Sequence, residues 1–369
     1  MKKRDQGENH KYCLGRQQIK ARKLKKNIRV SELVDDYFQA YNSARLNEAC
    51  RLLAQKMLDP QCDATIGLTL AGALTPAGMS GMVASMMEAG FVDFIIATGA
   101  NLYHDIHFAL NFPLVKGDFQ ADDTKLFDQD IVRIYDIFLG EKMLLGTDQY
   151  VRELIESEAF LKKEMSSSEM HNIIGRHLLK NAPNPDVSIL AQAAKFNVPV
   201  YTSSPGDSSI GMEIARFSLD KPGLKFDPNL DVLETTAIVA YAKKNGAILV
   251  GGGSPKNFYM QTQPMLWQFL NMSRGGHDYF IQITMDSPQW GGLSGATPSE
   301  AVSWGKINRE ELKNTVVVYS DSTIALPILF SYAYERCQPR KRKNLYLRRE
   351  DLMAKMKKEY KKKKLNSYV

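Results

Sequence analysis

A lysine, a tryptophan and a glutamate lie within seven residues of one another in the segment Glu300-Ala-Val-Ser-Trp-Gly-Lys306. A neutral lysine amine can attack an electrophilic carbon, and burial among apolar side chains disfavours the ammonium form of such a lysine. Lys306 is therefore a candidate nucleophile, with Trp304 as an apolar wall and Glu300 as a carboxylate for a cationic substrate. A lone lysine on a helix is more often a solvated surface charge, so spacing alone leaves both interpretations open.

Short apolar runs alternate with helix-length segments from about residue 30 onward. This alternation predicts an α/β fold, in which a parallel sheet is covered by helices on both faces. The expected strands are residues 65–70, 91–97, 197–202, 246–250, 279–284 and 315–319. The expected helices include residues 77–89, 188–196, 231–244 and 324–336. We expect residues 122–185 to form helices and connections between the two halves of the sheet.

Loops of small residues follow most of the expected strands. The carboxyl ends of parallel strands meet at one edge of a sheet, where backbone N–H groups and helix N-termini can receive phosphates. Together these loops indicate a dinucleotide site, although the G-x-G-x-x-G fingerprint is absent and no single loop is decisive. They comprise residues 71–78, 98–101, 203–211, 251–254 and 320–321.

The composition, 44% hydrophobic over 369 residues, suits a large globular protein. We find no membrane-length apolar run and no apolar stretch at the N-terminus, which predicts a cytoplasmic protein. His104 and His107 are close in sequence but have no third ligand nearby, so we expect no metal. The cysteines form no CxxC pair and predict neither a disulfide framework nor a zinc site; they are Cys13, Cys50, Cys62 and Cys337.

The net charge of +7 hides two basic ends. Residues 1–29 carry +9 and residues 340–369 carry +10, which leaves −12 on the part between them. We therefore predict a basic N-terminal arm (1–29), a catalytic domain (30–336) and a basic C-terminal tail (337–369). Such tails could contact nucleic acid, remain solvated, or dock on the acidic body of a neighbouring subunit. We favour the last two because no aromatic-interleaved recognition motif accompanies the tails.

The segment from Glu300 to Lys306 resembles the active-site segment of deoxyhypusine synthases, and the resemblance covers roughly residues 30–335. In that family the lysine carries a transferred aminobutyl group as an imine. The resemblance implies a Rossmann-like fold, a homotetramer with sites at subunit interfaces, NAD as cofactor and a polyamine or diamine substrate. It implies catalysis by Lys306, with Glu300 anchoring a terminal ammonium and Trp304 shaping the channel.

The family's NAD-binding loops also have counterparts in this chain. Residues 71–75 stand where the family wraps the pyrophosphate, and Asp207 takes the place of an aspartate that contacts NAD. Residues 251–253 are similar to the family's triple glycine. The resemblance therefore implies cofactor contacts from Gly72, Ala73, Leu74, Thr75, Thr98, Gly99, Asp207, Gly252, Ser294, Ser320 and Asp321.

Three positions depart from the family's substrate-binding pattern. Leu293 and Met212 stand where the family has aspartates, and Asn257 stands where it has a histidine. Each lost charged hydrogen bond removes on the order of 1.5–3 kcal/mol of attraction for a polyammonium substrate. We therefore expect the lysine chemistry to be kept on an altered amine. The acceptor, whether a small diamine as in a homospermidine-type reaction or a protein lysine, stays open.

Two other functions have some support in the sequence. A non-catalytic scaffold or RNA-associated protein could keep the fold and use the basic tails, but the lysine segment would then have no purpose. A serine hydrolase using Ser208 would need glycine two residues after the serine, where this chain has Ile210.

Overall fold

A six-stranded parallel sheet forms the centre of the computed structural model, which describes residues 18–157, 160, 164–220 and 224–366. The strand order is β11-β10-β9-β1-β2-β7, and every neighbouring pair is parallel. Read from β7, this is the order 3-2-1-4-5-6 of Rossmann-type sheets. All six predicted strands are confirmed, as β1 (Ala64–Leu70), β2 (Phe94–Ala97), β7 (Val200–Thr202), β9 (Lys244–Val250), β10 (Tyr279–Thr284) and β11 (Thr315–Tyr319).

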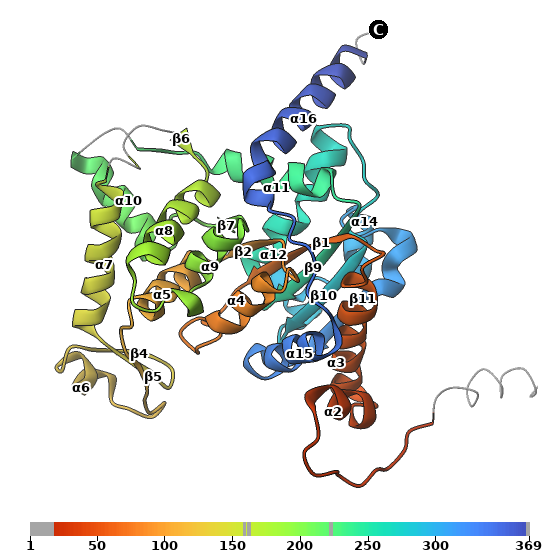
Figure 1. Cartoon of the computed structure of the whole chain (residues 1–369), viewed down its shortest axis with the longest axis horizontal. Helices are drawn as coiled ribbons and strands as arrows, with labels where there is room; N and C mark the ends of the chain where they lie inside the picture. Colours follow the sequence, from red (N-terminus) through yellow and green to blue (C-terminus); the bar gives the residue numbers. More distant parts are fainter. Residues whose placement is uncertain (1–17, 158–159, 161–163, 221–223, 367–369) are drawn as a thin grey trace, which may run out of the picture.

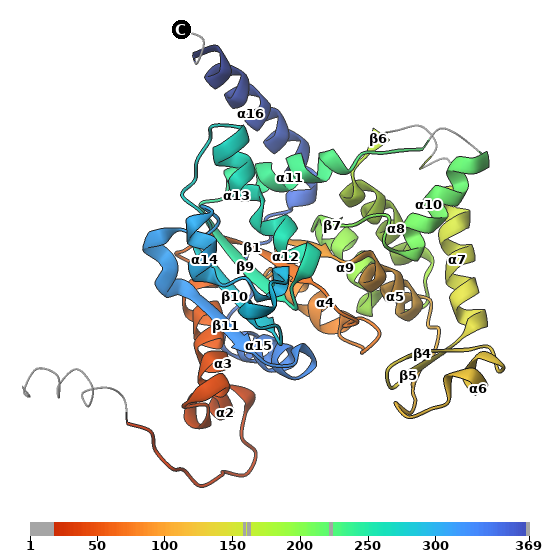
Figure 2. The same cartoon turned by 180° about the vertical axis from the view of Figure 1, so that it is seen from behind.

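Helices cover both faces of the sheet, as predicted (Figures 1 and 2). Successive strand residues point to opposite faces, so Ile248 and Val250 of β9 enter one hydrophobic core while Ala247 and Leu249 enter the other. The first core is shared with α3 (Tyr41–Leu52), α4 (Ser80–Glu88), α9 (Ile189–Phe196) and α15 (Ser322–Arg336). The second is shared with α11 (Pro228–Ala240), α12 (Gly253–Met260) and α16 (Leu345–Asn366).

The predicted helices correspond to α4, α9, α11 and α15, with shifted ends. The prediction 231–244 ran too far, because α11 ends at Ala240 and Lys244 already begins β9. The prediction 91–97 began too early. Asp93 accepts a hydrogen bond from the Ile66 backbone N–H through its carboxylate, and the strand begins only after it.

The region 122–185 differs from its prediction. It contains α6 (Asp123–Phe127), α7 (Glu141–Ile155) and α8 (Ser167–Asn181), but also two strands of a small antiparallel sheet. That sheet has the order β3-β5-β4, from Leu114–Lys116, Ile137–Gly140 and Ile131–Ile134. The region joins β2 to β7, which are neighbours on one side of β1, so it does not bridge the two halves.

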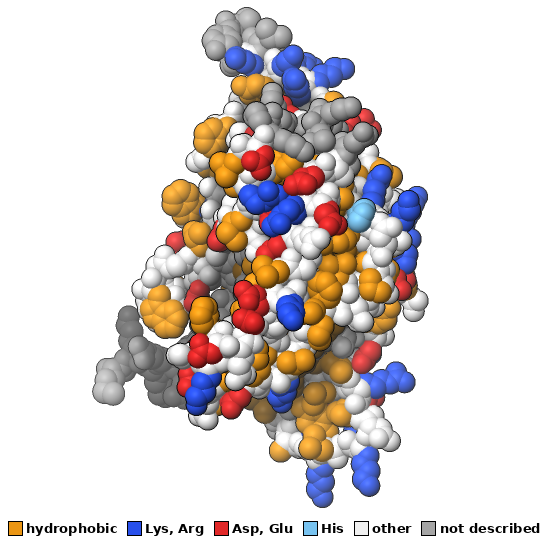
Figure 3. All heavy atoms as spheres, turned by 90° about the vertical axis from the view of Figure 1, so that its left-hand side faces the viewer, with side chains coloured by type: hydrophobic (Ala, Val, Ile, Leu, Met, Phe, Trp, Pro, Cys, Tyr) orange, Lys and Arg blue, Asp and Glu red, His pale blue; other side chains and the backbone are white. Residues whose placement is uncertain are grey.

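On the side of the molecule seen in Figure 3, basic and acidic side chains intermingle rather than form one charged face.

The C-terminal segment, predicted as a basic tail, is for the most part the helix α16. Leu352 and Met356 are buried against the second core, and α16 packs along α11. Arg349 of α16 approaches Glu234 of α11 at 3.5 Å, and both side chains are buried. The tail therefore docks on its own body over this length, with its lysines mostly on the exposed side.

Residues 1–17, including Cys13, lie outside the described residues. The arm from Lys20 onward contacts α2 (Val30–Tyr37) and the loop after it.

Within the described ranges, no helix has the length and apolar character to span a bilayer. Within the same ranges, no group of three or more His, Cys, Asp or Glu residues could hold a metal ion.

The packing of α16 predicts the effect of substitutions in it. Leu352→Ala and Met356→Ala should each lower the free energy of unfolding by about 2–5 kcal/mol, because they leave cavities beside α11. Lys358→Ala, on the exposed side of the same helix, should change it by less than about 0.5 kcal/mol. Urea unfolding measures all three. Equal, small effects would show that the helix does not pack on the body.

Candidate active site

The strand order reverses between β1 and β9, at the carboxyl edge of the sheet. From β1 the chain continues to β2 and β7 on one side, and from β9 to β10 and β11 on the other. Gly72 and Gly251 follow these two central strands with φ values of 80° and 78°. A Cβ atom on Gly251 would lie 3.1 Å from the carbonyl oxygen of Ala71. The two loops therefore approach through backbone atoms at the point where parallel sheets bind ligands.

Asn101, in the first turn of α5 (Gly99–Ala109), joins two of the predicted cofactor loops. Its side-chain nitrogen donates to the Gly72 carbonyl at 2.7 Å and to Thr98 Oγ1 at 2.8 Å. Its side-chain oxygen accepts from the Thr75 N–H at 3.1 Å, and its carbonyl accepts from the Thr75 hydroxyl at 2.8 Å. The sequence assigned no role to Asn101, although an amide beside a Thr-Gly turn is the kind of residue that ties loops together.

The loop after β7 lies against the same turn. A Cβ atom on Gly99 would be 2.4 Å from Ser208 Oγ, so the loop carrying Asp207 and Ser208 packs on a glycine that cannot be enlarged. Ser208 Oγ accepts a hydrogen bond from the Gly211 N–H, as a helix-capping serine does. The fold thus brings five of the predicted cofactor residues to one edge of the sheet, as the sequence predicts: Gly72, Thr75, Thr98, Gly99 and Asp207.

Gln282, in the middle of β10, forms a second junction with Lys256 of α12. The Gln282 side chain donates to the carbonyl oxygens of Gly251 at 3.0 Å and Ser294 at 2.8 Å. Its oxygen accepts from the Lys256 ammonium at 2.9 Å, and Lys256 also donates to the carbonyls of Ser294 and Ala296. Gln282 was not among the predicted site residues. The signal was a single amide between Ile281 and Ile283, in a strand that is buried along its whole length.

Ser294 in turn binds the glycine loop after β9. Its Oγ accepts from the Gly253 N–H at 2.9 Å, and a Cβ atom on Gly252 would lie 2.3 Å from Ser294 Cβ. The backbone of Gly252 is therefore in direct contact with Ser294. Two predicted cofactor residues from separate loops meet here.

The remaining predicted cofactor residues follow β11. Asp321 caps α15 by accepting hydrogen bonds from the backbone N–H and the hydroxyl of Thr323. The Ser320 N–H donates to the carbonyl of Thr284 at the end of β10. Both residues lie at the carboxyl edge, but β10 separates their strand from β9 and its glycine loop. Ser320 and Asp321 therefore lie farther from the centre of the sheet than Gly252, which follows β9.

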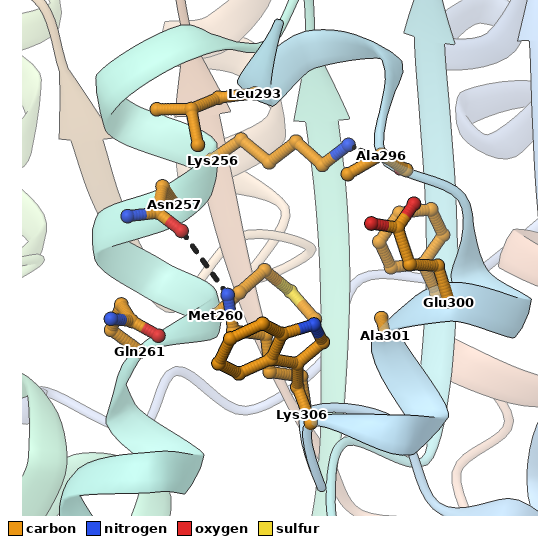
Figure 4. A pocket seen from close by; sticks show the side chains of 11 residues that line it. Lys256, Asn257, Met260, Gln261, Leu293, Ala296, Glu300, Ala301 and Lys306 are labelled. Carbon is orange, nitrogen blue, oxygen red and sulfur yellow. Dashed lines mark hydrogen bonds between the residues drawn. The ribbon is translucent and has the colours of Figure 1, made fainter. Parts of the chain in front are cut away.

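Lys306 opens onto a pocket of about 300 Å³. Glu300 and Trp304 line it from α14 (Pro298–Ser303) and the turn that follows, and Leu293 lines it from the preceding loop. Asn257 lines it from α12 on the opposite side (Figure 4). The other lining residues are mostly apolar: Lys256, Met260, Gln261, Phe280, Ala296 and Ala301.

Local backbone contacts hold Lys306 in place. Thr297 caps α14 by accepting from the Glu300 N–H, and the Lys306 N–H donates to the Ala301 carbonyl. The His277 N–H donates to the Lys306 carbonyl at 2.9 Å, which ties this turn to the start of β10. Gly305 adopts a φ of 65°, and a Cβ there would lie 2.8 Å from the Trp267 ring nitrogen.

The Lys306 amine lies in a mixed environment. Its Nζ donates to Asn257 Oδ1 at 3.2 Å (Figure 4). The same nitrogen lies 5.7 Å from the centre of the Trp304 ring. Burial lowers the pKa of Lys306, and the negative charge of Glu300 opposes this shift. The amine is thus closer to its neutral, nucleophilic form than a surface lysine would be.

Lys256 is the more buried lysine of the pocket, with 5% of its surface exposed. Burial, followed by repulsion from Lys306, lowers the pKa of Lys256 to about 8, against the opposing attraction of Glu300 and Asp286. All three hydrogens of its ammonium are used by oxygen acceptors. It therefore holds the loop in place rather than offering a free amine.

The pocket brings together five of the six predicted catalytic and substrate-binding residues: Lys306, Glu300, Trp304, Leu293 and Asn257. Met212 does not line it. It lies in the first turns of α10 (Ser209–Asp220) with 61% of its surface exposed. Of the two positions where the resemblance places an aspartate, Leu293 therefore lines the lysine pocket and Met212 of the same chain does not.

The sequence of this chain is similar to those of known proteins. The family model described as deoxyhypusine synthase matches residues 32–333. A deoxyhypusine synthase-like protein from Nostoc punctiforme is 47% identical over 352 residues, which cover 93% of this chain and 90% of that one. A "Probable deoxyhypusine synthase 2" from Methanosarcina acetivorans is 38% identical over 318 residues, covering 86% and 90%.

The fold is also similar to a solved structure. The crystal structure of a proposed deoxyhypusine synthase from Entamoeba histolytica superposes with a TM-score of 0.60 at 17% identity, covering 87% of this chain and 99% of that one. The family model and the curated relatives span nearly all of the chain. The chain therefore belongs to the deoxyhypusine synthase family, whose chemistry is that of a transferase.

Proposed function

We propose that this protein is an NAD-dependent transferase that moves an aminobutyl-type group from an amine donor through an imine on Lys306. The observation that carries the proposal is the position of Lys306. Its pKa is lowered by burial, and it lies in an apolar pocket beside the loop whose Ser294 contacts the glycines after β9. Family membership supports the transferase reaction.

The residues at the carboxyl edge fit a dinucleotide. The loops after β1 and β9 meet through glycine backbone, with N–H groups and the N-terminus of α12 beside them. Asn101 fixes the loops after β1 and β2 relative to each other. NAD bound there would accept a hydride from the carbon beside the donor's secondary nitrogen and return it at the end.

Lys306 then acts as the carrier. Loss of hydride leaves the donor as an imine, and the neutral Lys306 amine adds to its carbon. The bond to the original nitrogen breaks, a free amine leaves, and the carbon remains joined to Lys306 Nζ as an imine. The acceptor amine repeats this exchange, which releases Lys306 as a free amine and leaves an imine for the returning hydride.

The other pocket residues take supporting roles in this proposal. Glu300 anchors an ammonium of the substrate, and the Trp304 ring lies beside the cation. Asn257 accepts a hydrogen bond from Lys306 and so orients its amine. Leu293 offers an apolar contact where the family has a charged side chain. Met212 lies outside the pocket, and Glu300 is the one carboxylate among the described residues that line it.

The rim of the pocket supports assembly into an oligomer, and we propose a homotetramer. Trp304 is 57% exposed. Leu293, which lines the same pocket, and Trp267, whose ring nitrogen donates to the Trp304 carbonyl, are also exposed. Neighbouring exposed apolar side chains that form one patch are typical of surfaces that another protein covers. A second subunit over this rim would close the pocket.

We do not propose the scaffold alternative, because the lysine pocket is intact.

Borohydride trapping tests the lysine intermediate. When the protein is incubated with NAD and a panel of di- and polyamines, reduction should leave an alkyl adduct on Lys306, because an imine there becomes a stable secondary amine. Peptide mass spectrometry locates the adduct. Lys306→Arg should form none, whereas Lys313→Arg, at an exposed position outside the pocket, should label as the parent does. No adduct with any amine of the panel would rule out this mechanism.

The pH dependence tests the role of Glu300. The reactive form of Lys306 is neutral, so kcat/KM should rise with pH until the lysine has lost its proton. Glu300 raises the pKa of Lys306, so Glu300→Gln should move this rise to lower pH. It should also weaken amine binding by about 10- to 100-fold, because an ammonium loses its counter-charge. Glu310→Gln, outside the pocket, is the control, and an unmoved or upward-shifted profile for Glu300→Gln would contradict the assignment.

Gly252→Ala tests the dinucleotide edge. The new Cβ would collide with Ser294, so the loop must shift and NAD affinity should fall at least about tenfold. Ser294→Ala, which removes only the hydrogen bond to Gly253, should cause a smaller loss. Gly140→Ala, where a Cβ meets no atom within 4 Å, should bind NAD normally. Calorimetry gives the affinities and thermal melting confirms folding; unchanged affinity in Gly252→Ala would place the cofactor elsewhere.

A further inference from the structure

A second pocket, of about 350 Å³, adjoins the pocket of Lys306. The two share Asn257, Gln261 and Leu293 as lining residues. Figure 4 shows these three on one side of the Lys306 amine, with Glu300 on the other. A substrate whose ammonium binds Glu300 and whose reacting carbon meets Lys306 would therefore extend toward the second pocket.

Five hydroxyl side chains line the second pocket, which we call the hydroxyl pocket: Ser203, Thr235, Thr236, Ser254 and Thr262. They come from the loop after β7, from α11, from α12, and from the short helix α13 (Thr262–Pro264). None of the described residues that line this pocket is ionisable. Its polar surface is thus neutral.

Two of these hydroxyls have unused hydrogen-bonding capacity. Thr236 is 0% exposed, and neither its Oγ1 nor the buried Oγ of Ser203 has a hydrogen-bond partner in the described structure. The hydroxyls of Thr235 and Thr262 donate to backbone carbonyls at 2.7 Å, so their lone pairs remain as acceptors. A buried hydroxyl without a partner destabilises the folded protein, and a ligand that both donates and accepts would offset this cost.

Charges around the hydroxyl pocket disfavour a cation in it. The two acidic side chains of α11 that lie nearest in sequence, Asp231 and Glu234, are buried and do not line the pocket. Asp231 accepts from the Ser167 N–H and Glu234 accepts from the Tyr201 hydroxyl. In the neighbouring pocket, Glu300 already faces two lysines. An ammonium in the hydroxyl pocket would lose its hydration without gaining a counter-charge.

We propose that the hydroxyl pocket binds the far end of the amine substrate, and that this end is a neutral hydrogen-bonding group, such as a hydroxyl or an amide, rather than a second ammonium. The proposal rests on the function proposed above and specifies its substrate class. The substrate is an amine with one cationic end, held at Glu300, and one neutral polar end, held at Thr236 and Ser203.

A matched pair of probes tests this proposal. 1,5-Diaminopentane and 5-amino-1-pentanol have the same length and differ only in one terminal group. Calorimetry with the full-length protein and NAD at pH 7.5 should give the amino alcohol at least about tenfold tighter binding, because only the diamine must bury a second charge.

Variants locate the preference. Thr236→Val keeps the shape of the side chain but removes the free hydroxyl, so it should weaken the amino alcohol by about tenfold and leave the diamine nearly unchanged. Ser203→Ala should act in the same direction. Thr69→Val is the matched control, since Thr69 is equally buried with an unpartnered hydroxyl but lies within β1.

The results of this binding test can be told apart from those of the borohydride test on Lys306. Equal or tighter binding of the diamine, no measurable binding of either probe, or an unchanged preference in Thr236→Val would each overturn the hydroxyl pocket as the site of the substrate's neutral end. Because this is a binding measurement, such a result would leave a borohydride adduct on Lys306 unaffected. Absence of that adduct would reject the proposed function even if the amino alcohol binds.

Discussion

The hydrogen-bonded pair of Lys256 and Gln282 is the interaction on which the rest of the site depends. Gln282 is fixed in the central sheet, and its amide holds the carbonyls of Gly251 and Ser294. Lys256 joins it from α12 and extends the contact to Ala296, just before α14 begins. One buried ammonium and one buried amide thereby connect the glycine loop at the proposed dinucleotide site to the loop that leads into the Lys306 pocket. A buried ammonium requires all its donors to be satisfied, so this geometry is narrowly defined.

The parallel sheet explains why two different chemistries can meet here. Every strand of the central six-stranded sheet ends at the same edge. Loops that are far apart in the sequence are therefore close together in space. The loops after β1, β2, β7 and β9 supply glycine backbone suited to phosphates, while the loop after β10 supplies a lysine in an apolar pocket. In the proposed reaction, hydride transfer and imine formation must occur at the same carbon of one substrate. A fold that places both sites on one edge meets that requirement.

The sequence predicted the sheet well because its strands are buried runs of apolar, often β-branched, residues bounded by small-residue loops. It missed β3, β4 and β5, which are short and partly exposed and so lack that signal. Basic composition concealed the apolar stripe of Leu345, Leu352 and Met356 that packs α16 on the body. Within the site, Lys306, Glu300 and Trp304 were found from a local motif, whereas Asn101 and Gln282 act across long sequence separations and were overlooked. The hydroxyl pocket has no motif at all, since its residues come from four separate segments.

The central claim is that hydride transfer and the Lys306 imine belong to one reaction at one edge of the sheet. Isotope tracing tests it most directly, using a donor amine that carries two deuterium atoms on the carbon beside its secondary nitrogen. If the hydride is removed, held and returned within one catalytic cycle, the product should keep both deuterium atoms on that carbon, form only when NAD is present, and leave no free NADH. Loss of deuterium to solvent, accumulation of NADH in step with product, or product formation without NAD would contradict the account.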